Sequence, residues 1–122
     1  MVMDVRKTVV LVKAETTYDT DPTPTSTVDA ILAMGVEVKE NAGVIPRDAQ
    51  WKFLGQYPSL LGEQWAEVKM RIPVIGSGEA NTAPRIGALL KACGHSETIL
   101  SGVSVTYAPT SSNHGSCTIY VY

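Results

Sequence analysis

The most regular stretch of the sequence reads Ala66-Glu67-Val68-Lys69-Met70-Arg71-Ile72-Pro73-Val74. Apolar and polar side chains alternate strictly through it, which predicts a β-strand with one face on a core and the other in water. Pro73 has no backbone N–H to donate to a neighbouring strand, so this end should lie at a sheet edge or a bulge. The stretch favours a fold built on β-sheet.

Shorter runs of the same kind lie on both sides of this stretch. They predict strands at Lys7–Glu15, Ala30–Lys39, Asp48–Leu54, Val103–Tyr107 and Cys117–Val121. A turn at Asn41–Gly43 and an irregular connection at Gly55–Gly62 separate the middle runs, and the turn Ala108–Gly115 is expected to join the last two strands as a hairpin. The first run also fits one face of a short helix.

One loop and one helix complete the pattern. Thr16–Thr27 contains turn-forming residues and two prolines with almost nothing to bury, so it is predicted to be a loop. A helix is predicted to begin at a cap on Asn81 or Thr82, with Pro84 in its first turn, and to end before Gly94. Its apolar stripe consists of Ile86, Leu89, Leu90 and Cys93.

These elements predict a mainly β (α+β) protein: an antiparallel β-sandwich or partial barrel of about six strands with one flanking α-helix. The 122 residues, 44% hydrophobic and 18% charged, are predicted to form a single domain over residues 1–122, with a core that needs no metal or disulfide. The sequence stops at Tyr122 inside a strand pattern, so we expect it to be the N-terminal part of a longer protein.

Composition excludes several classes of function. A net charge of −2 leaves no basic surface for gripping nucleic acid phosphates. No run of about 18 apolar residues exists to span a membrane, and Met1–Lys7 lacks a signal-peptide pattern, so we expect a cytoplasmic protein. Cys93 and Cys117 are too few for a disulfide framework and are expected to be small buried hydrophobic residues.

Two groups of residues are similar to ligand sites. Zinc-ligand types occur as two pairs, Cys93 with His95 and His114 with Cys117, but the first pair is spaced more tightly than zinc sites require. Gly76-x-Gly78 lies before the predicted helix, as in a phosphate-binding loop, but Asn81 stands where a third glycine belongs. Neither spacing is adequate for its ligand.

Carboxylates and nucleophiles give no stronger signal. Oxygen ligands for calcium would come from Glu15, Asp19, Asp21 and Asp29, which lack the spacing of a calcium loop. No Gly-x-Ser-x-Gly elbow or serine–histidine pairing is evident. We therefore expect no catalytic residue, no metal and no cofactor, and we do not expect an enzyme.

Large apolar side chains also fall at positions predicted to be exposed. Trp65 lies on the polar face of the regular strand, and Tyr57, Leu60 and Leu61 lie in the connection before it. Exposed aromatic and leucine side chains are typical of an interaction surface. A small satellite core beneath the connection would explain them equally well.

Three blocks of sequence together resemble the phage tail tube (major tail) protein family, in its N-terminal portion. The first is Glu15–Thr25 (ETTYDTDPTPT), in which Asp19 stands where that family commonly has glycine. The second, Thr82–Gly94 (TAPRIGALLKACG), resembles the family's helix, and the third is Val105–Ser111 (VTYAPTS). The blocks occur in the family's order and spacing and together span nearly the whole chain.

The resemblance implies a structural virion protein of a phage or prophage and not an enzyme. Tail tube proteins have a β-sandwich or barrel core with a flanking helix, and they self-assemble into rings, usually hexameric, that stack to form the DNA-conducting tail channel. The implied partners are further copies of the chain and other tail proteins. DNA would pass through without specific binding, and no membrane or small-molecule substrate is implied. The implied location is the virion tail, assembled in the cytoplasm of the bacterial host.

Two loops are the implied places of contact between subunits or stacked rings, namely Thr16–Thr27 and Gly55–Gly62. The interface candidates in and beside them are Tyr18, Asp19, Pro22, Pro24, Tyr57, Leu60, Leu61 and Trp65. The alternative hypothesis is a small β-sandwich module that binds a sugar or a protein partner through Trp51, Tyr57 and Trp65.

Overall fold

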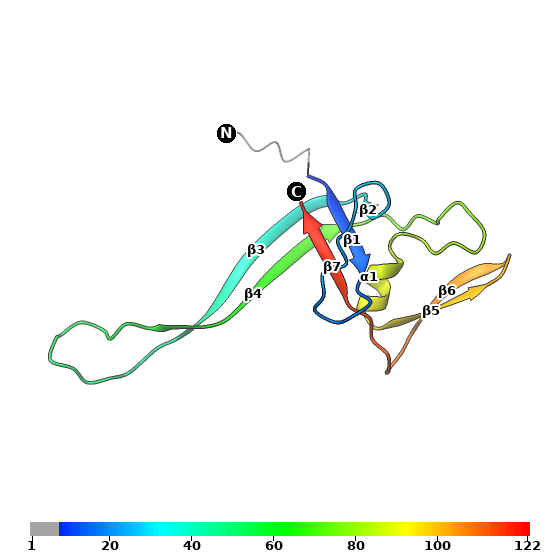
Figure 1. Ribbon diagram of the computed structural model, residues 1–122. Coiled ribbons are helices and arrows are strands. Elements are labelled where there is room, and N and C mark those ends of the chain that lie inside the picture. The colour runs from blue at the N-terminus through cyan, green and yellow to red at the C-terminus, as the bar shows by residue number, and fades with distance from the viewer. Residues whose placement is uncertain (1–7) are drawn as a thin grey trace. The chain divides into compact units, whose positions relative to one another are not determined.

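The computed structural model describes residues 8–122, so the segment Met1–Lys7 and the start of the first predicted strand at Lys7 lie outside the described residues. The described chain divides into two compact units. The first comprises residues 8–34 and 71–122, and the second is Gly35–Met70. Figure 1 shows the course of the chain through both.

The protein is mainly β with one short helix, as the sequence predicts. In chain order the elements are β1 (Val10–Ala14), β2 (Ala30–Ile31), β3 (Met34–Ile45), β4 (Leu60–Arg71), α1 (Gly87–Ala92), β5 (His95–Leu100), β6 (Ser104–Pro109) and β7 (Cys117–Val121). The strands form three small sheets with the orders β2-β1-β7, β3-β4 and β5-β6. The described strands are thus divided among three small antiparallel sheets, with one short helix beside them.

The core of the first unit lies on β1, the central strand of the three-stranded sheet. Val10, Leu11 and Val12 are only 1%, 4% and 4% exposed. Consecutive residues of a strand point to opposite faces, so their joint burial means that both faces of β1 are covered. This segment is a strand, and the short-helix alternative is wrong.

The strand pairing of the first unit differs from the predicted one. β7 pairs antiparallel with β1 along its length, from Val10 opposite Val121 to Ala14 opposite Cys117. The predicted hairpin between the last two strands is therefore wrong, because β6 pairs antiparallel with β5 instead. β5 has little signature in the sequence, since Ile99 and Leu100 are its only apolar residues.

Helix α1 is shorter than predicted. The Gly87 N–H donates to the Pro84 carbonyl at 2.8 Å and closes a turn, and the first helical bond runs from the Leu90 N–H to the Ile86 carbonyl at 3.1 Å. No side chain caps this end, so the predicted cap at Asn81 or Thr82 is wrong. At the other end Gly94 has a φ of +83°, the left-handed conformation that glycine adopts after a helix, as predicted.

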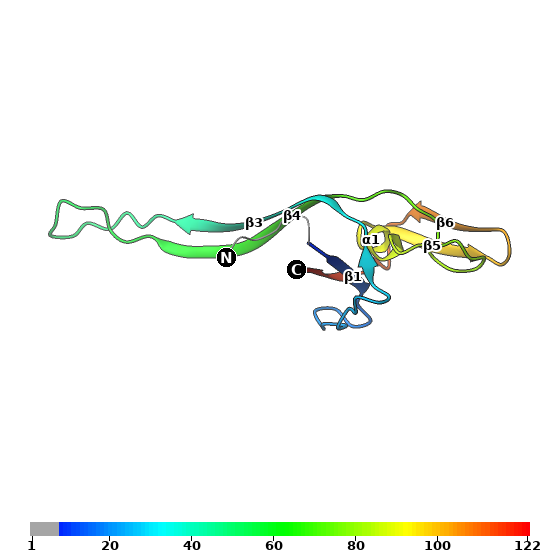
Figure 2. The same cartoon turned by 90° about the horizontal axis from the view of Figure 1, so that it is seen from above.

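The helix connects the two sheets of the first unit. α1 packs against β1 and β7 of one sheet and against β5 of the other, and Figures 1 and 2 both show it between them. It has six residues, and no helix in residues 8–122 has the length and apolar character needed to cross a membrane.

The second unit is a ribbon of two long strands, β3 and β4, joined by the loop 46–59. Each strand has twelve residues, which corresponds to about 40 Å. β3 continues through Asn41–Gly43, so the turn predicted there is wrong, and the predicted strand Asp48–Leu54 is part of the loop. β4 contains most of the alternating stretch but ends at Arg71, before Pro73 removes a backbone donor.

The predicted strand Ala30–Lys39 is divided between two sheets. Its start forms β2, which pairs with β1, and its remainder begins β3 after a break at Leu32 and Ala33. Gly35, the second residue of β3, has a φ of +61°, a conformation that a side chain would disfavour. The chain therefore changes sheets where the glycine permits an unusual backbone.

Candidate interaction surfaces

The ribbon formed by β3 and β4 buries little of its own apolar surface. Every residue of both strands is exposed or half-buried. The exposed large apolar side chains of the ribbon and its loop are Met34, Val38, Val44, Ile45, Trp51, Phe53, Leu54, Leu60, Leu61 and Trp65. A two-stranded hairpin alone is marginally stable in water, and large apolar side chains exposed in such numbers favour an interaction surface. We therefore treat the ribbon as a candidate surface for contact with another protein chain.

Four of the predicted interface residues belong to this unit. Leu60, Leu61 and Trp65 lie in β4 and are 49%, 63% and 54% exposed. Tyr57 is half-buried in the loop 46–59. The exposure of the three β4 side chains disagrees with a satellite core at their positions, whereas Tyr57 does pack against neighbours.

The loop 46–59 holds a compact group of aromatic and basic side chains, which we call the tip cluster: Arg47, Trp51, Lys52, Phe53 and Tyr57. The Trp51 ring lies edge-on to two others, with centroids 5.2 Å from Phe53 and 5.1 Å from Tyr57. The Trp51 indole N–H also donates to the Gly55 carbonyl at 2.9 Å. These contacts fix the aromatic rings before any partner arrives, and Trp51 and Phe53 are still 45% and 59% exposed.

Both cations of the tip cluster rest on aromatic rings. The Arg47 guanidinium lies 4.4 Å from the Tyr57 ring centroid, and its Nε–H donates to the Pro58 carbonyl at 3.0 Å. The Lys52 ammonium lies 5.2 Å from the Phe53 centroid. Neither cation forms an ion pair within residues 8–122, where the ion pairs are Lys69 with Glu67 and Lys91 with Glu97. Both charges are therefore available to a carboxylate partner.

The first unit contains an apolar groove of about 480 Å³ beside β2. Its apolar lining includes Ile31, Leu32, Ile72, Pro73, Ile75 and Ile86. Leu32 and Ile75 are 65% and 60% exposed at its rim. Two charged side chains also line it: Arg85 donates from Nη1 to the Ala30 carbonyl at 2.9 Å, and Glu79 has no side-chain partner in the described chain.

Residues 15–29, here called the Thr/Pro loop, lie against one face of the β2-β1-β7 sheet, which we call the main sheet. The Glu15 carboxylate accepts hydrogen bonds from Ser116 Oγ and Thr118 Oγ1, each at 2.7 Å, and the Tyr120 hydroxyl donates to Asp21. Thr118 and Tyr120 share a face of β7, because alternate strand residues point the same way. The loop is thus attached to the sheet by hydrogen bonds that its carboxylates accept from hydroxyl groups of residues 116–120.

The four predicted interface residues of this loop differ in exposure. Tyr18 is 84% exposed, Asp19 is exposed and Pro22 is half-buried. Pro24 is buried, although the sequence places it in a loop with almost nothing to bury. The hydrogen bonds to β7 hold the loop against the sheet, and this explains how a proline within it becomes covered.

The hydrogen bonds also shift the acidity of the groups involved. Donation from Ser116 and Thr118 lowers the pKa of Glu15, and donation from Tyr120 and the Thr23 N–H lowers the pKa of Asp21. The same bond raises the pKa of Tyr120. The carboxylates are therefore held ionised as acceptors, a structural role that requires no substrate.

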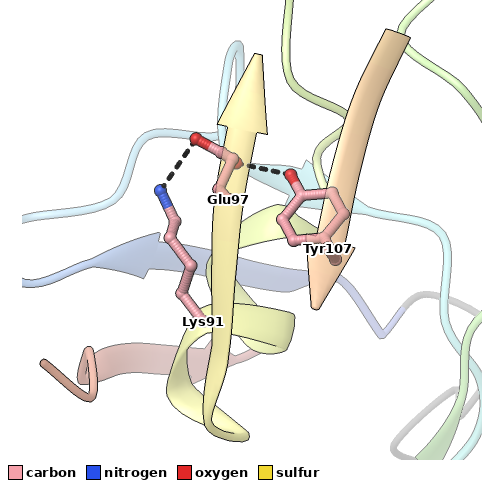
Figure 3. A network of polar contacts seen from close by, with 3 residues as sticks. All are labelled: Lys91, Glu97 and Tyr107. Atoms are coloured by element: carbon pink, nitrogen blue, oxygen red, sulfur yellow. Dashed lines mark hydrogen bonds and ion pairs between the residues drawn. The ribbon is translucent and has the colours of Figure 1, made fainter. Parts of the chain in front are cut away.

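A second polar network joins α1 to the β5–β6 sheet (Figure 3). Glu97 in β5 accepts a hydrogen bond from the Tyr107 hydroxyl at 2.5 Å and pairs with Lys91 of α1 at 3.4 Å. Partial burial, followed by the bond to Glu97, raises the pKa of Tyr107. Gly87 lies so close that a methyl group there would collide with the Tyr107 hydroxyl. The network positions the helix, and Lys91 and Glu97 also line a small pocket of about 220 Å³ beside β1.

The ligand sites considered from the sequence are not assembled. In residues 8–122 no three His, Cys, Asp or Glu side chains gather where they could hold a metal ion, so the zinc and calcium alternatives gain no support. Cys93 is exposed and Cys117 half-buried, so the expected burial of both is wrong. Helix α1 begins nine residues after Gly78, and thus the glycines do not open directly into a helix as a phosphate loop requires.

The sequence names Trp51 and Tyr57 as binding anchors, but it predicts neither the cluster that they form with Arg47, Lys52 and Phe53 nor the groove. The alternation of Trp51 and Phe53 predicts one face of a strand, but both residues lie in a loop where their rings contact each other. Pro46, Pro58 and Gly55 around them are the signal for a loop. The groove combines segments far apart in sequence, so no local pattern marks it.

Comparison with known proteins gives no assignment: the chain matches no protein-family model, no curated protein and no solved structure.

Proposed function

We propose that this chain is a structural subunit that assembles with copies of itself, like the phage tail tube proteins that its sequence resembles. The observation that carries the proposal is the β3–β4 ribbon, whose apolar side chains are exposed along both strands and the loop between them. If another copy covered this surface, each Å² of apolar area removed from water would stabilise the contact by about 25 cal/mol. Self-association is therefore the activity that the geometry favours.

A backbone detail supports the resemblance to that family. Asp19 has a φ of +60°, in the left-handed region where glycine is most easily accommodated and where aspartate is tolerated. The tail tube family commonly has glycine at the corresponding position. The local conformation thus explains why glycine and aspartate would both serve there.

In the proposed role, copies form rings, and the rings stack into a channel in the virion tail together with other tail proteins. DNA would pass through this channel without specific binding. The net charge of −2 is consistent with such a conduit, because a surface that neutralised phosphates would retain the DNA. The role requires no catalytic residue and no cofactor.

Size-exclusion chromatography with light scattering over a wide concentration range tests the proposal, with negative-stain images of the same samples. We expect a mass that rises with concentration, and rings or tubes in the images. A monomer at every concentration would contradict self-assembly by this chain.

A monomeric binding module is the second candidate, and the tip cluster is the observation that favours it. Trp51 and Tyr57, two of its three proposed anchors, are in direct ring contact. The third, Trp65, is exposed on β4. This candidate predicts that the chain is a monomer and that its tryptophan fluorescence changes when a glycan is added. A chain that assembles and shows no such change in fluorescence would contradict it.

A further inference from the structure

We propose that the tip cluster of one copy docks into the apolar groove of a second copy. This inference rests on the proposed function, because it names the two surfaces through which copies would meet. The two surfaces belong to different parts of the chain, so the contact is heterologous, and a pair of copies keeps one free groove on the first copy and one free tip on the second. Such a contact extends into a closed ring or an open filament.

The groove is large enough to accept apolar side chains of the kind that the tip exposes. The groove of about 480 Å³ falls within the roughly 300–1,000 Å³ of sites that enclose a ligand. Its apolar lining suits the exposed side chains of Trp51, Phe53 and Leu54, and Leu54 has no protein cover at all. Trp, Tyr and Arg are also the residues that most often dominate binding energy at interfaces.

The charges of the tip cluster and of the groove can form an ion pair when the two surfaces meet. Glu79 lines the groove without a side-chain partner in the described chain, and the groove's cation, Arg85, donates to the Ala30 carbonyl but, like Arg47 of the tip, has no ion pair there. The tip offers Arg47 and Lys52, which lie on aromatic rings and have no carboxylate partner in the described chain. Asp48 lies between them in sequence and leaves one net positive charge in the loop 46–59. In the proposed contact, Lys52 beside the Phe53 ring would approach the unpaired carboxylate of Glu79 in the groove.

Two single variants at exposed positions test the contact on the full chain. Leu54→Asp places a charge on the tip and Ile75→Asp places one at the groove rim, and neither side chain is part of the core. Each is expected to raise the concentration at which light scattering detects assembly by on the order of tenfold or more. Val103→Asp, at a side chain that is 75% exposed and not part of the groove lining, is the matched control and should assemble like the unmodified chain.

Mixing the two defective variants gives the sharper result. A Leu54→Asp copy keeps a sound groove and an Ile75→Asp copy keeps a sound tip, so an equimolar mixture should form heterodimers that cannot extend. A mixture that stays monomeric would overturn the proposal, as would variants that assemble like the unmodified chain.

Charge reversal tests the ionic part of the contact. Lys52→Glu and Glu79→Lys should each weaken assembly, and the double variant should recover most of the loss, because every contact then contains the reversed pair. Failure of the double variant to recover would overturn the assigned charge pairing. If the unmodified chain assembles and all these variants match it, the docking proposal fails while the proposed function stands. If the unmodified chain never assembles, both fail.

Discussion

The hydroxyl of Tyr120 in β7 donates a hydrogen bond to the carboxylate of Asp21 in the Thr/Pro loop, 99 positions earlier in the chain. Ser116 and Thr118 hold Glu15, at the start of the loop, in the same way. A segment with almost no apolar residues is therefore attached to the main sheet by its acidic side chains. The attachment depends on those carboxylates being ionised.

The loop attachment should weaken in acid. The pKa values of Glu15 and Asp21 are lower in the folded chain than in the unfolded chain, so their contribution is complete above the unfolded values of about 4. It is lost as the pH falls through the folded values. Amide chemical shifts of residues 16–29, followed from about pH 7 to about pH 2, should report release of the loop at the acid end.

Asp21→Asn provides the control for this pH dependence. The asparagine amide oxygen still accepts a hydrogen bond from Tyr120 but does not titrate over this range. The variant should therefore lose the part of the transition that belongs to Asp21. An unchanged transition in the variant would assign the acid response to other groups.

Replacing Gly87 by alanine should destabilise the first unit, although alanine is normally the better helix former. The added methyl group would collide with the Tyr107 hydroxyl and crowd Glu97, and overpacking of this kind costs about 1–3 kcal/mol. Urea denaturation measures the change in the free energy of unfolding. Combining Gly87→Ala with Tyr107→Phe removes the colliding oxygen and should recover part of the loss, whereas independent, additive effects would contradict the proposed collision.

Gly94→Ala should also be destabilising, for a reason that concerns the backbone. Gly94 has a φ of +83°, and an alanine in the left-handed region costs about 1–2 kcal/mol. The matched control is Gly76→Ala, because Gly76 has no positive φ and an added methyl there would meet no atom within 4 Å. Thermal unfolding should separate the two variants by several degrees. Equal melting temperatures would show that the turn after α1 relaxes.

The two cysteines should react at different rates with an alkylating reagent at neutral pH. Cys93 is exposed, whereas partial burial, helped by the nearby Glu15 carboxylate and Cys93, raises the pKa of Cys117 and lowers its thiolate fraction. Mass spectrometry of peptides after timed labelling should find Cys93 modified first. In denaturant the two rates should become similar, and a difference that persists there would point to local sequence as its cause.

Local patterns in the sequence predict individual elements better than they predict partners. The alternation from Ala66 to Arg71 and the one in Cys117–Val121 both correspond to strands. The glycine after α1 is recognisable because it supplies a conformation that other residues avoid. In each case the cause acts over a few neighbouring residues.

Errors arise where distant segments decide the outcome. β7 pairs with β1, over a hundred positions earlier, and β5 is a strand because β6 lies beside it. Trp51 and Phe53 alternate as they would in a strand, but they lie in a loop where their rings contact each other. The groove gathers residues 30–32, 72–79 and 82–86, and no pattern within any one of these segments announces it.

The pairing of β1 with β7 also has a consequence for biosynthesis. The main sheet joins residues 10–14 to residues 117–121, so its central strand has no partner along one edge until β7 has left the ribosome. Contacts of such large sequence separation slow folding, because the entropy cost of closing a long loop comes before the strands gain any stability from pairing. During translation Val10, Leu11 and Val12 therefore lack the cover of β7 until the end of β7 has been made, and apolar surface exposed in this way favours premature association.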